Sequence, residues 1–194
     1  MDDTRVIAAA PHSTQTARIE TARLILQPHA LSDFAESFAL FSDPEVFRYI
    51  SGRLGTREEA WSRLLRYIGH WAALGFGYWV VREKTSNAFV GEIGFANYER
   101  IIEPSFAGIP EMGWALMPAL QGKGYANEAA TAALAWADRQ WPGGTTGCMI
   151  SPENLASIRL ATRHGFAEVV ATTYAEHATL VFHRHGASSR ISAS

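Results

Sequence analysis

The stretch from Glu111 to Ala130 constrains the fold of this chain more than any other. It reads EMGWALMPALQGKGYANEAA: an apolar run typical of a strand, a glycine-rich turn, and an alanine-rich pattern typical of a helix. Glycines let a turn point several backbone N–H groups into one concavity, and the first helical turn adds unpaired donors and the positive end of the helix dipole. The stretch therefore predicts a strand–loop–helix unit that binds an anion, and phosphate is the obvious ligand.

The segments before this unit predict one strand followed by a largely helical region. The strand spans residues 23–28 and ends at Pro28. Helix caps and apolar repeats then predict three helices: one capped by Ser32 and carrying Phe34, Phe38 and Phe41, a short one from Asp43-Pro44 through Tyr49, and one with a capping box at Thr56–Glu59 that ends at Gly75.

Short apolar runs predict the remaining strands. Residues 77–82 and 88–95 flank Lys84–Asn87 and predict an antiparallel hairpin, and the connection from Glu99 to Pro110 is placed to shape the mouth of a pocket. A mixed sheet with helices on both faces, an α/β (α+β) fold, fits the order of elements. After the central unit we expect a strand at 145–150, a helix at 152–164 with Gly165 in the C-cap position, and a pair of strands at 169–174 and 178–183.

The bulk composition predicts one domain in a chain that works in the cytoplasm. A length of 194 residues with 47% hydrophobic residues is enough for one core, which we place at 18–185 between flexible tails at 1–17 and 186–194. A net charge of −2 argues against duplex nucleic acid and anionic membrane as partners. We expect no membrane span and no signal peptide, and we interpret Cys148 as a buried small hydrophobe.

Two general nucleotide motifs fail at the glycine loop. Gly122-Lys123 lacks the upstream glycine and the following Ser or Thr of a P-loop, and Asn127 stands where a dinucleotide fingerprint needs its third glycine. The pattern that the loop does match is Q/R-x-x-G-x-G/A, met by Gln121-Gly-Lys-Gly-Tyr-Ala126.

This loop resembles the acetyl-coenzyme A loop of the GCN5-related N-acetyltransferases (GNAT). Flanking motifs stand at the spacings of that family: Glu111-Met-Gly-Trp, Asn127-Glu-Ala, Asn154-x-x-Ser157 and His164-Gly-Phe166. Residues 21–26, 42–46 and 90–94 resemble its ribosomal-protein (RimJ/RimL-type) branch. The resemblance covers about residues 19–184 and implies a single-domain fold whose central strands splay apart to leave a cleft for the thioester.

The same resemblance implies which residues bind acetyl-CoA. The coenzyme-binding set comprises loop residues at the pyrophosphate and others along the pantetheine arm: Gln121, Gly122, Lys123, Gly124, Tyr125 and Ala126 at the pyrophosphate, and Leu116, Met117, Asn154 and Ser157 along the arm. Lys123 either attracts phosphate or is plain solvated charge. Gly124→Val is expected to fill the phosphate concavity.

The implied reaction is direct acetyl transfer from sulfur to a primary amine, either a protein N-terminus or a small amine. A carboxylate is the natural base, and Glu111 is the first candidate and Glu92 the second, although strand alternation also explains an acid that faces solvent. The tyrosine that many members use as proton donor is replaced by Ala161, so Ser157, Tyr174 or solvent remain as donors. This loss also leaves open a non-catalytic acyl-CoA-binding or sensing domain.

Other residues give weaker indications. His183 and His185 share a strand face but lack a third ligand nearby, so we expect no metal. Trp79, Phe95 and Trp114 are most simply core, with Trp114 or Phe95 as alternatives for shaping the acceptor pocket. Both a monomer and a homodimer through the terminal strands remain open, and the acceptor depends on the helical region, the 99–110 loop and those strands.

Overall fold

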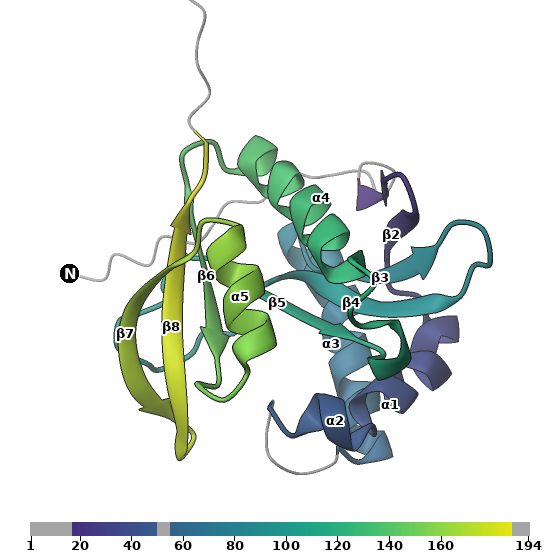
Figure 1. The fold of residues 1–194 in the computed structure, drawn as a ribbon, viewed down its shortest axis with the longest axis horizontal. Coiled ribbons are helices and arrows are strands. Elements are labelled where there is room, and N and C mark those ends of the chain that lie inside the picture. The colour runs from purple at the N-terminus through teal and green to yellow at the C-terminus, as the bar shows by residue number, and fades with distance from the viewer. Residues whose placement is uncertain (1–16, 50–54, 188–194) are drawn as a thin grey trace, which may run out of the picture.

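The fold is built on one eight-stranded sheet, seen in a computed structural model that describes residues 17–49 and 55–187 (Figure 1). Its strands lie in the order β1-β2-β3-β4-β5-β6-β8-β7. Their bounds are β1 Ile19–Glu20, β2 Leu24–Pro28, β3 Tyr78–Glu83, β4 Phe89–Ala96, β5 Glu111–Leu116, β6 Thr145–Ile150, β7 Ala167–Tyr174 and β8 His177–His185.

Two sets of helices cover the two faces of this sheet (Figure 1). Helices α4 and α5 pack on one face, and α1, α2 and α3 pack on the other. Their bounds, with those of two short 3-10 helices, are η2 Leu31–Asp33, α1 Phe34–Phe41, α2 Pro44–Phe47, α3 Arg57–Leu74, η3 Pro118–Leu120, α4 Tyr125–Gln140 and α5 Leu155–Arg163.

The sheet is antiparallel at every junction except one. Strands β5 and β6 run parallel, and among the described residues only Glu111 and Gly147 are in register between them. The two strands therefore diverge after that pair. This confirms the expected mixed, mostly antiparallel sheet with splayed central strands.

Strand register places the two candidate acids on the same face. Glu92 lies opposite Ala115, and Ala96 lies opposite Glu111, so both acids point to the side covered by α1–α3. Ala115 and Glu111 are four residues apart on β5, which puts the acids roughly 13 Å apart along the sheet at about 3.3 Å per residue. The two acids therefore stand at separate positions along the sheet.

The core on the α4 side is aromatic. Trp79 and Phe95 are fully buried, and the Trp136 ring of α4 lies 5.1 Å from Trp79. Small side chains on α4, Ala130 and Ala133 among them, are buried and let the helix approach the sheet closely. Trp79 and Phe95 are thus core, and Cys148, 1% exposed, is the buried hydrophobe expected, with burial raising the pKa of its thiol.

Most element boundaries are confirmed, and three helix ends differ. The capping box at Thr56 and the left-handed Gly75 bound α3 as expected. Ser32 was the wrong cap: it lies inside η2, where Asp33 accepts a hydrogen bond from the Ala30 N–H and α1 begins only at Phe34.

The other two differences have local causes. Helix α2 ends at Phe47, two residues before the expected Tyr49. Helix α5 begins at Leu155, not at Pro152, because the Asn154 side chain accepts from the Ser157 N–H and acts as the N-cap. The expected tails fall almost entirely on residues 1–16 and 188–194, which lie outside the described residues. No described helix is long and apolar enough to cross a bilayer.

Candidate active site

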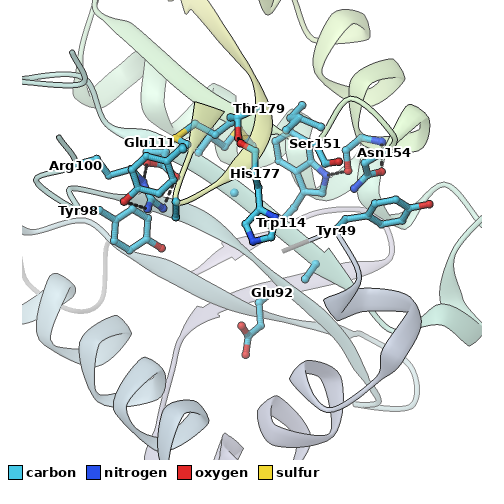
Figure 2. Close-up of a pocket in the computed structure, with 18 of the residues that line it drawn as sticks. Tyr49, Glu92, Tyr98, Arg100, Glu111, Trp114, Ser151, Asn154, His177 and Thr179 are labelled. Atoms are coloured by element: carbon cyan, nitrogen blue, oxygen red, sulfur yellow. Dashed lines mark hydrogen bonds and ion pairs between the residues drawn. The ribbon is translucent and has the colours of Figure 1, made fainter. Parts of the chain in front are cut away.

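A cavity of about 670 Å³ opens where β5 and β6 diverge (Figure 2). Its lining comes from the end of α1, the turn after α2, α3, β3, β4, the loop at Tyr98 and Arg100, β5, β6, the start of α5 and the β7–β8 hairpin. Six of the residues singled out from sequence meet in this lining: Glu92, Glu111, Trp114, Asn154, Ser157 and Tyr174. Leu116 at the end of β5, Met117 and the glycine loop that follows do not line this cavity.

The glycine loop has the geometry of an anion site. Gly122 and Gly124 adopt left-handed φ values of 74° and 80°, and Gly124 is the N-cap of α4. Within the described chain, the backbone N–H groups of Gly122 to Ala126 have no acceptor. Gln121 instead turns its side chain back to donate to the Leu116 carbonyl, which joins the loop to the end of β5. Free amides at a helix start are what a phosphate requires.

Side chains from the start of the chain brace this loop. Arg23 donates to the Lys123 carbonyl at 3.0 Å and pairs with Glu128 at 2.7 Å, and Glu128 also accepts from the Thr21 hydroxyl. Tyr125 donates its hydroxyl to Glu83 on β3. Sequence reasoning missed the role of Arg23, because a hundred residues separate it from the loop.

Glu92 is a buried acid with a raised pKa. It is 1% exposed, and burial raises its pKa to about 7 despite a 2.5 Å hydrogen bond from the Ser37 hydroxyl to Oε1. The second oxygen, Oε2, has no partner among the described residues. His29 lies 3.9 Å away, and burial lowers the pKa of that imidazole to about 4, so it stays neutral near pH 7. Glu92 can therefore exchange a proton near neutral pH.

Glu111 is instead neutralised by a bidentate ion pair. Arg100 donates from Nε and Nη2 to its two carboxylate oxygens at 2.6 and 3.0 Å. Arg100 also donates to the Tyr174 hydroxyl, and Figure 2 shows this group apart from Glu92. Burial opposes the charge on Arg100, but the hydrogen bonds that it donates to Glu111 raise its pKa above the ordinary value. Both oxygens of Glu111 are therefore occupied by Arg100.

A chain of hydrogen bonds connects β5 to α5 on the other side of the cavity. The Trp114 indole N–H donates to the Ser157 hydroxyl at 3.1 Å, and the Ser157 N–H donates to Asn154 Oδ1. The Asn154 side-chain nitrogen and the Ser157 hydroxyl proton remain free to donate to a ligand. Trp114 thus lines the pocket, which is the alternative its sequence left open.

Three tyrosines, Tyr67, Tyr78 and Tyr98, form the wall near α3. The rings of Tyr67 and Tyr78 stack with centroids 4.3 Å apart, and burial raises the pKa of both hydroxyls. The Tyr78 hydroxyl lies 2.0 Å from where a Cβ on Gly113 would be, so that strand position needs glycine. A glycine inside the β5 pattern was the available signal for this close approach.

No metal site is found among the residues described. No group of three or more His, Cys, Asp or Glu side chains is arranged to hold an ion there. His185 instead makes a hydrogen bond with the Thr145 hydroxyl, and the ring of Phe106 packs against His183.

Comparison with known proteins places this architecture in one family. The acetyltransferase (GNAT) domain pattern matches residues 23–167. YkkB of Bacillus subtilis, an uncharacterised protein, is 31% identical over 154 residues, covering 76% of this chain and 84% of that protein. A Bordetella pertussis protein assigned to the GnaT family of acetyltransferases superposes with a TM-score of 0.77 at 33% identity, over 86% of this chain and 98% of that one.

The fold extends to more distant enzymes. RimL, the ribosomal L7/L12 α-N-protein acetyltransferase solved with coenzyme A, superposes with a TM-score of 0.69 at 18% identity, over 86% of this chain and 96% of that one. The family match spans β2 through the start of β7, including the splayed strands, the glycine loop and the Asn154 cap. This chain therefore belongs to the GNAT family of acetyltransferases.

Proposed function

We propose that the protein transfers an acetyl group from acetyl-CoA directly to a primary amine, with Glu92 as the general base. The observation that carries this proposal is the buried Glu92 carboxyl on the wall of the cavity, with a pKa of about 7 and one oxygen free. A base whose pKa lies near the working pH combines a useful ionised fraction with enough basicity to take a proton. Glu111, the first candidate from sequence, is a weaker choice because Arg100 occupies both its oxygens.

The glycine loop suits the pyrophosphate of the coenzyme. The free amides of Gly122 to Ala126 and the start of α4 favour an anion there, and Lys123 adds a positive charge. Leu116 and Met117 lead from β5 to this loop, where they are placed to line the pantetheine arm. Bound acetyl-CoA would supply the activated acetyl group. Asn154, whose side-chain nitrogen is not used in its helix cap, is placed to donate to the arm.

In this proposal two residues carry the two proton transfers of the reaction, Glu92 at the amine and Ser157 at the departing sulfur. Ionised Glu92 takes the proton that the amine must lose, and because the carboxyl is 1% exposed a single water is the natural bridge. Ser157 keeps a hydroxyl proton while its oxygen accepts from Trp114, so it is placed to donate to the departing sulfur in place of the tyrosine that Ala161 replaces. Ala161 itself is buried and chemically inert.

A thiol-release assay tests this function. The protein is incubated with acetyl-CoA and a panel of small amines, free peptides and ribosomal proteins, and free coenzyme thiol is followed. Release that depends on an amine, with the acetylated amine found by mass spectrometry, is expected. The panel also decides between a protein N-terminus and a small amine as acceptor.

The rival is a non-catalytic acyl-CoA sensor, favoured by the missing tyrosine at Ala161. Tight coenzyme binding by calorimetry without amine-dependent thiol release across the panel would support that rival and contradict the proposed function.

A further inference from the structure

We propose that the amine acceptor carries a carboxylate, and that Arg63 and Arg66 on α3 bind it. This inference rests on the proposed acetyl transfer and names the class of amine that the same cavity accepts. The carboxylate belongs either to a free small molecule or to an acidic side chain beside a protein N-terminus.

Three arginines of the cavity have no acidic partner among the described residues. Several arginines outside the cavity do pair with acids: Arg23 with Glu128, Arg82 with Asp33 and Arg184 with Asp138, at 2.7, 2.7 and 2.8 Å. Within the cavity Arg100 is likewise paired, with Glu111. Over residues 17–49 and 55–187, no carboxylate lies within ion-pair distance of Arg48, Arg63 or Arg66.

Aromatic rings contact all three of these guanidinium groups, and Arg48 Cζ lies 4.6 Å from the ring centroid of Tyr49. Arg63 Cζ lies 3.7 Å from the ring centroid of Phe41, and Arg66 Cζ lies 5.3 Å from that of Tyr98. Both rings also line the cavity. Contact through the flat face positions a guanidinium without using its N–H groups, which stay available for bidentate binding of a carboxylate.

The net charge of the cavity lining disfavours an amine that carries no carboxylate. Four arginines, Arg48, Arg63, Arg66 and Arg100, face two glutamates, Glu92 and Glu111, so cations exceed acids by two. Most free amines are protonated in neutral water, and such a cation is repelled by this surplus. An amine that also carries a carboxylate reverses the sign of that interaction.

The carboxylate site and the base line the same cavity. The charge of Arg63 acts on Glu92, where it favours the ionised form of that acid. An acceptor with its amine toward Glu92 and its carboxylate toward Arg63 and Arg66 therefore meets opposite charge at both ends.

Matched acceptors test the inference. Phenylalanine is compared with phenethylamine, and peptides with Glu as second residue are compared with their Gln counterparts. The carboxylated member of a pair is expected to have a kcat/KM about 10- to 100-fold higher, as charged hydrogen bonds provide. Arg63→Gln and Arg66→Gln should bring this ratio toward one. If only phenylalanine is preferred over its partner, the acceptor is a small molecule. If only the Glu peptides are preferred over their partners, the acceptor is a protein N-terminus.

Arg57→Gln is the matched control. Arg57 stands on the same helix and its Cζ lies 4.7 Å from the Phe34 ring, but it does not line the cavity. The ratio should be unchanged in this variant. Equal kcat/KM within every pair, with turnover intact, would overturn the inference and leave the proposed function standing.

A binding measurement that needs no turnover distinguishes failure of the carboxylate site from failure of the proposed acetyl transfer. Calorimetry compares hydrocinnamate with its neutral amide, neither of which is an acetyl acceptor. Preference for hydrocinnamate that is lost in Arg63→Gln and Arg66→Gln supports the carboxylate site even if no amine is acetylated. Equal binding of the two compounds by the wild-type protein overturns it.

Discussion

The proposed coenzyme loop and the proposed acceptor end of the cavity are built in opposite ways. The loop uses backbone groups from one short stretch, with Gly122 and Gly124 in left-handed conformations that leave amides free. The acceptor end uses side chains that meet from distant elements, such as Glu92 on β4 and Arg63 on α3. A site made of backbone binds what every family member needs, whereas a site made of side chains can change its acceptor without disturbing the coenzyme.

Of the variants considered, Glu92→Gln should have the largest effect on turnover. This effect should be confined to the acceptor end. We expect kcat to drop by roughly 10²–10⁴-fold, the usual contribution of a general base, while coenzyme affinity by calorimetry stays unchanged. In the wild-type protein kcat/KM should rise with pH through about 7 as Glu92 loses its proton, and this step should vanish in the variant. Wild-type turnover in Glu92→Gln would remove Glu92 as the base.

Gly124→Val should damage the coenzyme end alone. Gly124 has a φ of 80°, and its ideal Cβ lies 3.3 Å from Arg23 Nη2, so the substitution strains the loop and its brace. The sequence alone predicted a different cause, namely that the valine side chain would fill the phosphate concavity. Strain of about 1–3 kcal/mol together with misaligned amides should weaken coenzyme binding about 100-fold.

A glycine that is free of such strain provides the control for Gly124→Val. Gly69 lies in α3 with open space around its Cβ position, so Gly69→Ala should leave coenzyme binding intact. Unchanged coenzyme affinity in folded Gly124→Val would contradict the anion site.

Glu92→Gln should also stabilise the fold at alkaline pH. The pKa of the folded carboxyl is about 7, whereas the ordinary pKa of a free glutamate is 4.5, so between these pH values unfolding releases a proton and stability falls as pH rises. At pH 8 the variant should gain about 1–3 kcal/mol of unfolding free energy, and at pH 5 much less.

Denaturant unfolding of both proteins measures this gain. Burial lowers the pKa of His29 to about 4, which makes the fold less stable as pH falls from 6.5, but both proteins share that effect. The difference between them therefore reports Glu92, and a gain that did not depend on pH would contradict the raised pKa.

Glu111→Gln should have a smaller effect on turnover. The change leaves the partly buried Arg100 without its ion-pair partner, so we expect a stability loss of about 1–2 kcal/mol and a fall in kcat/KM of about tenfold through misplaced neighbours. The pH step near 7 should remain. Loss of that step, with turnover as low as in Glu92→Gln, would return Glu111 to the role of base.

Lys123→Gln should have the smallest effect. The residue is exposed on the loop, and an exposed charge contributes at most about 1 kcal/mol, or a few-fold in coenzyme affinity. The difference between wild type and variant should shrink as salt is raised from low to physiological levels. A deficit that persists at high salt would mean that Lys123 makes a direct contact.

The parts of the fold that could be predicted are those that local sequence signals determine. The capping box at Thr56, the Asp43-Pro44 start and the strand at 145–150 each depend on residues adjacent in sequence, and each was confirmed. The start of α1 was missed because Asp33, one residue after Ser32, forms its turn with Ala30 and pairs with Arg82 on β3. The turn with Ala30 is local, but the pairing of Asp33 with Arg82 is a tertiary contact that the nearby sequence does not show.

The candidate site likewise contains residues that a local motif predicts and residues whose role depends on tertiary contacts. The loop residues and Asn154 follow from a motif, whereas the ranking of Glu92 and Glu111 depends on Arg100, which reaches Glu111 from the 99–110 loop. Periodicity marks both acids as unusual in strands but cannot report that one is paired and the other is buried beside Ser37. Geometry of that kind comes from the tertiary fold.

The divergence of β5 and β6 also affects how the sheet opens. The single registered pair, Glu111 with Gly147, joins a unit of strands β1–β5 to a unit of β6, β8 and β7 in the described structure. Such a seam allows each unit to open without the other. The slowest amide hydrogen exchange is therefore expected within each unit, in β3, β4 and β8. Faster exchange is expected in β5 and β6, although they lie at the geometric centre of the sheet.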